Sequence, residues 1–389
     1  MGETVIVAGS IAQRPGSRPG GGGHTWVFLQ YLLGFKRLGY DVLFIDRLEP
    51  EMCVDRNGNP APFESSFNLR YIAEVMDRFG LSGNWALLYD AGREIVGRTR
   101  DEVLERVRRS TLLLNVMGFL DDEEILAAAP LRVFLDIDPG FGQMWQELGL
   151  ARMFHGHHRY LTVGERIGAP DCGIPTCGIE WATTKPPVEL SEWPPATTNG
   201  AGFTTVASWR GPFGPIEYRG RTYGLRVHEF RRFFELPELV REPFELALDI
   251  DEADGEDLRR LAQHGWSLAD PHEAAGDPWR YREYVRRSSA ELNIAKNLYV
   301  DTRSGWFSDR SACYLASGRP VLAQDTALDG LLPRGEGLVT FSTLDEAAAG
   351  AEEITRDYGR HSRAAREIAA EHFAAERVLP RMLDALGFG

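Results

Sequence analysis

The chain has 389 residues, of which 43% are hydrophobic and 26% are charged, and its formal net charge is −14. This composition is typical of a globular protein, and the length predicts two domains or one large domain. The acidic balance argues against a protein built mainly to bind a nucleic-acid backbone, although it leaves room for a local basic pocket that takes a small phosphate compound.

The cysteines and the apolar runs indicate the compartment. Four cysteines are scattered along the chain and form no CxxC pair, so no disulfide framework is predicted. The first ten residues lack a basic region followed by a long apolar run, and no apolar stretch approaches the roughly 18–20 residues of a membrane helix. We expect a cytoplasmic protein without an integral membrane segment.

The first half alternates short apolar runs with helical patterns. Residues 4–9 form a β-branched run closed by glycine, residues 24–38 have an apolar helical face, and residues 40–46 predict a second strand. Such a β-α-β unit is the building block of a parallel, doubly wound sheet. The alternation continues with predicted helices at 67–79, 99–109 and 121–129, and strands at 85–89, 111–116, 131–138 and 159–164, the last strand expected in this half.

A second alternating series follows a linker at residues 184–202, which is rich in proline and glycine. The fold class is therefore α/β, with two Rossmann-like doubly wound domains, residues 1–190 and 191–372, that face a cleft, and a final helix at 373–389 able to pack back on the first domain. The predicted strands are 203–207, 244–250, 298–300 and 320–323, the helices 255–264, 279–288 and 308–317, and the helical tail 344–358 and 361–386.

A glycine run at residues 20–23 precedes the first predicted helix. Gly21, Gly22 and Gly23 allow close approach of a ligand to the backbone, and a helix N-terminus favours an anion. The run lies too far from the first strand for a nicotinamide-binding fingerprint. The neutral imidazole of His24 can deprotonate a hydroxyl near pH 7. A flexible loop and a solvent-exposed histidine are the alternative interpretations.

Acidic residues end two predicted strands. Asp136 and Asp138 lie on one side of their strand, where they can orient an acceptor hydroxyl or accept its proton. A loop-capping role is the alternative. Glu165 follows the next strand and is a further candidate in the cleft. The histidines at 155, 157 and 158 have no cysteine or carboxylate partner in the pattern, so we predict no metal site.

The most informative segment is 302–322. A glycine-containing turn enters a helix at Ser308, whose N-terminal amides suit a phosphate. Arg303 and Arg310 add positive charge, and a guanidinium matches two phosphate oxygens at once. Arg210 is another cation at the carboxyl end of a predicted strand. The alternative is a capped structural helix.

Residues 316–321, Ala-Ser-Gly-Arg-Pro-Val, resemble the Ala-x-Gly-x-Pro-Val motif of GT-B glycosyltransferases, in which this region closes on the donor diphosphate. The layout of two Rossmann-like domains, first glycine loop, central linker and helical tail is similar over nearly the whole chain. The resemblance implies a hexosyltransferase-like enzyme that needs no metal or cofactor. It transfers a sugar from a nucleoside-diphosphate sugar to a small-molecule or glycan acceptor, with no nucleic-acid partner.

The resemblance also implies site residues. His24 is at the place of the histidine that activates the acceptor in inverting members. Many retaining members carry two glutamates where this chain has Gly305 and Cys313, which weakens a retaining assignment. Gln324 and Asp325 resemble the acidic–glutamine pair that touches the sugar in some inverting members. The implied donor site comprises Arg210, Arg303, Ser308, Asp309, Arg310, Ser311, Gln324 and Asp325.

The mechanism that follows is a direct displacement. The acceptor, deprotonated by His24 or by Asp136 or Asp138, attacks the anomeric carbon, and helix amides and guanidinium groups stabilise the leaving diphosphate. Two alternatives remain, a two-domain sugar-nucleotide epimerase and a non-catalytic protein that binds a nucleotide or sugar. The acidic balance disfavours a glucosyltransferase that modifies nucleic acid.

Overall fold

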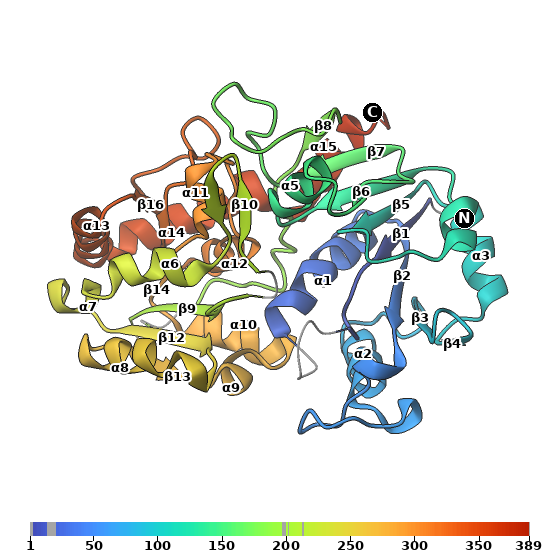
Figure 1. Ribbon diagram of the computed structural model, residues 1–389, viewed down its shortest axis with the longest axis horizontal. Helices are drawn as coiled ribbons and strands as arrows, with labels where there is room; N and C mark the ends of the chain where they lie inside the picture. The colour runs from blue at the N-terminus through green and yellow to red at the C-terminus, as the bar shows by residue number, and fades with distance from the viewer. Residues whose placement is uncertain (1–2, 14–20, 197–199, 201, 212–213, 389) are drawn as a thin grey trace.

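The computed structural model describes residues 3–13, 21–196, 200, 202–211 and 214–388. Two mainly parallel sheets lie next to each other, and helices cover their faces (Figure 1). This arrangement confirms the predicted α/β class with two Rossmann-like domains. No helix in these ranges combines the length and apolarity needed to cross a membrane.

The first sheet has eight strands in the order β4-β3-β2-β1-β5-β6-β7-β8, and only β3 and β4 pair antiparallel. The expectation that residues 159–164 form the last strand is wrong, because the short β8 pairs with β7. The strand bounds are β1 Thr4–Ala8, β2 Asp41–Leu48, β3 Trp85–Tyr89, β4 Glu94–Val96, β5 Leu112–Val116, β6 Arg132–Asp136, β7 Arg159–Thr162 and β8 Trp181–Thr183.

The helices of this domain begin at residues that favour helix ends. Ser66 caps α2, and Thr99 and Glu102 form a capping box at α3. α1 buries Trp26, Phe28 and other large side chains against the sheet. The helices are α1 Gly22–Arg37, α2 Phe67–Arg78, α3 Arg100–Arg108, α4 Glu123–Ala128 and α5 Phe141–Glu147, with 3₁₀ turns at Pro50–Met52 and Phe63–Ser65.

The second sheet is parallel throughout, in the order β13-β12-β9-β14-β15-β16. The strand predicted at 298–300 is wrong, since these residues belong to helix α11 and the strand beside β9 is β14. The sequence did not predict β14 because Glu291 and Asn293 make this segment polar, although both side chains are buried. The strands are β9 Phe203–Ser208, β12 Phe244–Asp249, β13 Ser267–Ala269, β14 Ala290–Asn293, β15 Val321–Gln324 and β16 Leu338–Phe341.

A two-stranded hairpin, β10 Ile216–Tyr218 and β11 Arg221–Tyr223, leaves the second domain after β9 and packs against α5 of the first. The helices that follow it are α6 Arg226–Phe230, α7 Leu236–Leu239, α8 Gly255–Gln263, α9 Pro271–Ala275, α10 Pro278–Arg287, α11 Asn297–Asp301 and α12 Asp309–Ala316, with 3₁₀ turns at Arg231–Phe233 and Glu252–Asp254.

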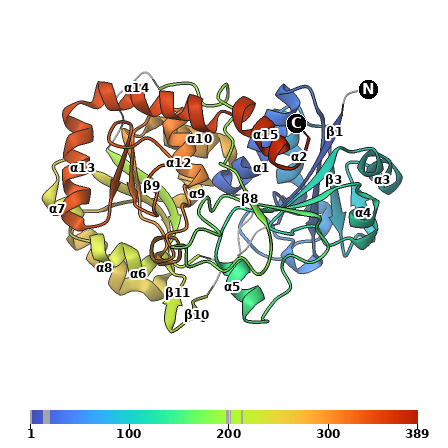
Figure 2. The same cartoon turned by 90° about the horizontal axis from the view of Figure 1, so that it is seen from above.

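The chain ends in α13 Leu344–Arg356, α14 Tyr358–Ile368, a π-helical turn Ala369–Phe373 and α15 Ala375–Ala385. α15 returns to the first domain and lies along α1 (Figure 2). The contact is close: a Cβ atom on Gly34 of α1 would lie 2.7 Å from Leu379 Cδ1 and 2.8 Å from Ala375 Cβ. Gly34 therefore allows the last helix to hold the two domains together.

Candidate functional site

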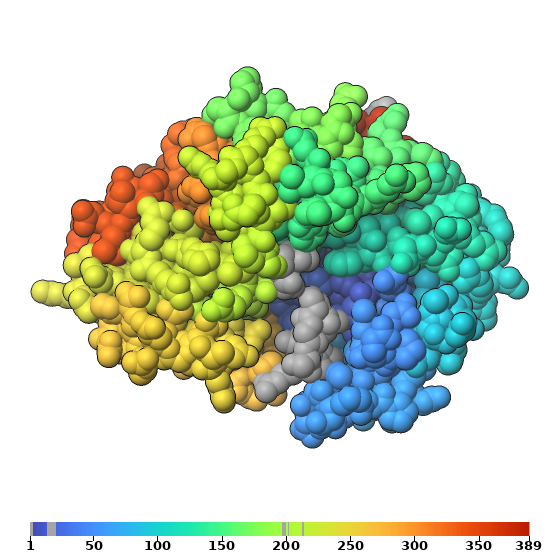
Figure 3. Space-filling model, viewed as in Figure 1, coloured from blue at the N-terminus to red at the C-terminus, as the bar shows by residue number. Residues whose placement is uncertain are grey.

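A cavity of about 260 Å³, here called the interdomain pocket, opens between the two domains. The N-terminus of α1, with Gly21, Gly23 and His24, forms one wall. The opposite wall is formed by the carboxyl ends of β9 and β12, the start of α9 and the first turn of α12. The face drawn in Figure 3 is hollowed along this boundary. Ligands of parallel α/β sheets bind at this edge.

The glycine run serves an interdomain contact as well as the pocket wall. A Cβ atom on Gly22 would lie 2.0 Å from the carbonyl oxygen of Asp277, and one on Gly23 would lie 3.0 Å from Tyr281 Cε2. α1 therefore packs its first turn directly against the start of α10. Residue 20 of the run lies outside the described residues.

His24 projects from the first turn of α1 into the interdomain pocket. Its Nε2 is 2.8 Å from Oγ of Ser10, a buried residue just beyond the carboxyl end of β1. The imidazole also meets the rings of Phe28 and Phe119 edge-on, with centroids 5.1 and 6.3 Å away. These contacts fix the ring at the boundary between the first sheet and the cavity.

α12 presents its N-terminus to the interdomain pocket through Asp309 and Arg310. Ser308 caps the helix, because its Oγ accepts a hydrogen bond from the Arg310 amide at 3.2 Å. The backbone ladder begins only at Ala312, whose amide donates to Ser308. The amides of the first turn therefore lie where a helix binds anions.

The guanidinium of Arg310 is held by the second sheet. Its Nε pairs with buried Glu291, Nη1 donates to the Val206 carbonyl at 2.8 Å, and Nη2 donates to Asn293 Oδ1 at 3.0 Å. Glu291 raises the pKa of Arg310, whereas burial opposes that shift. Arg310 therefore gives the pocket wall a fixed positive charge, with each nitrogen already bonded to protein.

Three other predicted donor residues stabilise the same sheet edge. Ser311 accepts from Asn293 Nδ2 at 3.0 Å. Gln324 accepts from the Ala295 amide at 3.1 Å and donates to Glu229 at 2.7 Å. Asp325 accepts from the amides of the turn that follows it, at 3.0 and 3.1 Å. None of the three lines the interdomain pocket.

Two predicted cations are bound to carboxylates, Arg210 to the buried Asp254 and Arg303 to the exposed Asp171. Arg210 Nε is 2.9 Å from Asp254 Oδ2, and Arg303 Nε is 3.0 Å from Asp171 Oδ2. Both arginines are exposed, and neither lines the interdomain pocket.

Arg226 is a candidate that sequence reasoning missed. It is the first residue of α6, its Nε is buried, and within the described ranges its guanidinium has no hydrogen bond or ion pair. Burial, together with the nearby charge of Arg310, lowers its pKa to about 10, while Tyr299 and Asp138 act in the opposite direction. Arg226 as a whole is half-buried and does not line the interdomain pocket, but a guanidinium without a protein partner suits an anionic ligand. Sequence reasoning missed Arg226 because this residue lies in a stretch rich in arginine and glycine that shows no distinguishing pattern.

Asp136, the last residue of β6, and Asp138, which follows the strand, lie in different surroundings. Asp136 is buried, and its Oδ2 accepts from Gln143 Nε2 at 2.6 Å and from Thr162 Oγ1 at 3.0 Å. Burial raises its pKa to about 7. Asp138 forms an ion pair of 2.9 Å with Lys296 of the second domain and accepts from the hydroxyl of Tyr299. Neither aspartate lines the interdomain pocket.

Glu165 is also engaged elsewhere. Its Oε1 accepts from Lys185 Nζ at 2.6 Å, and burial raises its pKa although Lys185 acts against the shift. Lys185 lies in the segment that leads from the first domain to the second, so the Glu165–Lys185 pair holds this connecting segment in place. Among the described residues, no three His, Cys, Asp or Glu side chains are grouped so as to hold a metal ion.

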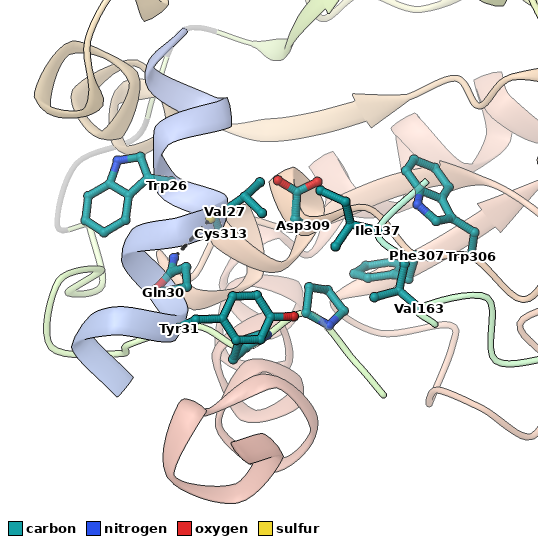
Figure 4. Close-up of a pocket in the computed structure, with 12 residues that line it drawn as sticks. Trp26, Val27, Gln30, Tyr31, Ile137, Val163, Trp306, Phe307, Asp309 and Cys313 are labelled. Carbon is teal, nitrogen blue, oxygen red and sulfur yellow. Dashed lines mark hydrogen bonds between the residues drawn. The ribbon is translucent and has the colours of Figure 1, made fainter. Parts of the chain in front are cut away.

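Figure 4 shows a second, smaller cavity of about 30 Å³. Asp309 lines both this cavity and the interdomain pocket. Its other walls are mainly apolar, including Trp26 and Trp306, and Gln30 donates to the buried thiol of Cys313 across 3.7 Å. Burial raises the pKa of Asp309, and Arg310 partly offsets this effect. The volume suits a water molecule rather than a substrate.

No family model and no curated protein matches this chain. Solved structures are similar along almost its whole length. One is described as an α-glucosyltransferase in complex with UDP-glucose and DNA containing an abasic site, with a TM-score of 0.57, 11% identity and 98% of each chain covered. Another is AviGT4, described as a glycosyltransferase involved in avilamycin A biosynthesis, with a TM-score of 0.56, 14% identity, and 98% of this chain and 96% of that chain covered.

A third similar structure is Alr3699/HepE from Anabaena in complex with UDP and glucose, with a TM-score of 0.55, 11% identity and 99% of each chain covered. At these identities the likeness concerns the fold. It confirms the GT-B arrangement of two Rossmann-like domains that the motif at 316–321 predicted.

Proposed function

We propose that this protein transfers a sugar from a nucleoside-diphosphate sugar to a hydroxyl-bearing acceptor. The observation that carries the proposal is the interdomain pocket, in which the N-terminus of α12 faces the first turn of α1 with His24. One wall thus offers groups that bind an anion, and the other offers a proton acceptor. Two of the three similar structures are described as complexes with UDP-glucose or with UDP and glucose.

The donor diphosphate binds at the α12 end of the pocket in this proposal. First-turn amides and the helix dipole favour negative charge there, and Arg310 contributes a fixed cation. Arg226 does not itself line the pocket, but its charge and that of Arg310 influence each other, and its guanidinium has no protein partner in the described ranges. In this proposal it bonds directly to a phosphate oxygen that reaches past Arg310. Because these groups provide the positive charge, we expect turnover to survive EDTA.

His24 acts at the other end of the pocket. Its imidazole takes the proton of the acceptor hydroxyl, the oxygen forms a bond to the anomeric carbon, and the nucleoside diphosphate leaves with the bonding electrons. Positive groups already in place then stabilise the charge on the leaving oxygen. A direct displacement of this kind inverts the anomeric configuration.

We place the acceptor among small molecules and glycans. The net charge of −14 opposes close approach of a nucleic-acid backbone, whereas one similar structure is described as a complex with DNA. Gel-shift measurements with duplex DNA at low salt test this part of the proposal, and salt-sensitive binding would overturn it.

A ligand screen followed by turnover assays tests the proposed function. The protein is heated with UDP, GDP, ADP or dTDP, and a ligand at about 100 times its Kd adds roughly 2.7 kcal/mol of stability. The sugar donor of the stabilising nucleotide is then incubated with and without a panel of acceptors. Acceptor-dependent release of diphosphate supports transfer. Failure of every nucleotide to stabilise the protein, or isomerisation of UDP-GlcNAc without acceptor, would overturn it, and the latter result would favour an epimerase.

A further inference from the structure

The base of the proposed reaction has a buried hydroxyl as a hydrogen-bond partner. Nε2 of His24 lies 2.8 Å from Oγ of Ser10. His24 is half-buried and lines the interdomain pocket, whereas Ser10 is 1% exposed and does not line it. The hydrogen bond therefore leads from the pocket wall into the first domain, and it directs Nε2 away from a ligand in the cavity.

Ser10 is held in place from both sides. The preceding Gly9 follows β1, and a Cβ atom on Gly9 would lie 2.2 Å from Cε1 of Phe28, so a glycine is needed for the end of β1 to approach α1 this closely. On the other side, the amide of Ala12 donates to Oδ2 of the buried Asp46 at 2.6 Å. The hydroxyl of Ser10 therefore has a fixed position before any ligand binds.

The two tautomers of His24 differ in what they can do in the pocket. A serine hydroxyl donates or accepts, and a neutral imidazole carries its proton on one of two nitrogens. With the proton on Nε2, the ring donates to Ser10 and keeps a lone pair on Nδ1. With the proton on Nδ1, the lone pair points at Ser10, where an acceptor in the pocket does not reach it. Only the first tautomer can take a proton from the acceptor.

We propose that Ser10 is a positioning residue for sugar transfer, which accepts a hydrogen bond from Nε2–H of His24 and so makes Nδ1 the atom that takes the acceptor proton. The inference rests on the proposed function and adds the tautomer of its base. In the step, the acceptor O–H bond breaks and an Nδ1–H bond forms. The acceptor oxygen bonds to the anomeric carbon, and the diphosphate leaves with the electron pair of its C–O bond. Ser10 keeps its own proton throughout.

The tautomer of the resting protein tests the role of Ser10 without turnover. The full chain is labelled with isotopic histidine for nitrogen NMR, and the His24 signals among the nine histidines are those lost in His24→Gln. We expect the proton on Nε2 at about pH 8, visible as a bonded N–H signal because Ser10 slows its exchange with water. This signal should broaden away in Ser10→Ala. Ser110→Ala, which removes a buried hydroxyl just before β5, is the matched control and should keep it.

Steady-state kinetics test the same residue in the reaction. Ser10→Ala should lower kcat by about tenfold, because the imidazole is no longer held in the productive tautomer and orientation, and should change KM by less than about twofold. Ser10→Thr keeps the hydroxyl and should recover most of the lost kcat. Ser110→Ala should have the kcat of the wild type.

The outcomes separate the two proposals. A proton on Nδ1 in the wild type, an Nε2–H signal that survives in Ser10→Ala, or an unchanged kcat in Ser10→Ala overturns the role of Ser10 and leaves the proposed transfer standing. Absence of turnover by the wild type with every donor and acceptor overturns the proposed function and the catalytic role of Ser10 together. The tautomer of the wild type is measured without any dependence on the folding of the Ser10 variants.

Discussion

Asp138 and Lys296 form an ion pair of 2.9 Å that joins the first domain to the second. Asp138 follows β6, Lys296 precedes α11, and the hydroxyl of Tyr299 donates to the same carboxylate. Apolar side chains from both domains, among them Phe141 and Leu298, pack around the pair. The domains are therefore linked on this side of the pocket as well as through α1, α10 and α15.

Breaking this ion pair should reduce stability in a coupled way. Asp138→Asn and Lys296→Met each leave a partly desolvated charge without its partner, so each should lower the free energy of unfolding by about 1–2 kcal/mol. The double variant should lose less than the sum of the two single changes, with a coupling energy of about 1 kcal/mol from denaturant titrations. Strict additivity would contradict the pairing.

The same two variants test whether Asp138 is a base. If its carboxylate only joins the domains, Asp138→Asn and Lys296→Met should reduce turnover by similar factors. A loss of about 10²-fold or more in Asp138→Asn alone would identify it as a proton acceptor instead of His24.

Removal of the His24 imidazole should impair the chemical step and spare nucleotide binding. We expect His24→Gln to lower kcat by about 10²-fold or more, with the Kd for the diphosphate changed by less than about twofold. His155→Gln, at an exposed histidine outside the pocket, is the matched control. Equal kcat values in both variants would exclude His24 as the base.

Variants of Arg226 and Arg210 compare a half-buried cation that has no protein partner in the described ranges with an exposed cation in an ion pair. Arg226→Met should weaken nucleoside-diphosphate binding by about tenfold or more, because a charge-assisted bond to phosphate is lost. Arg210 is bound to Asp254, so Arg210→Met should weaken binding by much less. Fluorescence titration of the two variants provides the comparison, and the reverse order of effects would restore Arg210 to the donor site.

The alternation of apolar runs and helical patterns predicted most inner strands of both sheets, because buried parallel strands are nearly continuous apolar runs. It missed the short edge strands β4, β8, β13 and β16, which have only three or four residues each. The prediction also failed where the buried side chains of a strand are polar. β14 carries Glu291 and Asn293, and Oε1 of the first and Oδ1 of the second accept hydrogen bonds from Arg310 of α12, a partner distant in sequence. Conversely, residues 298–300 form an apolar run that was predicted to be a strand. They belong to helix α11, and Leu298 and Tyr299 are apolar because they are buried between the domains.

The candidate site was predictable only in part. His24, Asp309 and Arg310 do line the interdomain pocket, since strand ends and helix starts fix their positions along the chain. Whether a charged side chain is free depends on tertiary partners that the sequence does not reveal. Arg210 has an ion-pair partner, and Arg226 has none among the described residues.

Gly22 should tolerate no side chain. A Cβ atom there would lie 2.0 Å from the Asp277 carbonyl oxygen, so Gly22→Ala must push α1 away from α10 and should cost about 1–3 kcal/mol or more. Gly21→Ala is the control, because its nearest neighbour would be His24 Cβ at 3.6 Å. Thermal unfolding of the two variants measures the difference, and equal melting temperatures would contradict the close interdomain packing.

Two buried carboxyls should make stability fall as pH rises from about 4 to 7. Burial raises the pKa of Asp46 and of Asp136 to about 7, above the value of about 3.9 in an unfolded chain. The folded state then binds more protons than the unfolded state in this range, so the free energy of unfolding decreases with pH and levels off above it. The decrease is at most about 4 kcal/mol for each carboxyl. Denaturant titrations of Asp136→Asn between pH 5 and 8 should show a smaller slope than the wild type. The exposed Glu252→Gln should keep the full slope, and identical slopes in all three proteins would mean that Asp136 is ionised throughout.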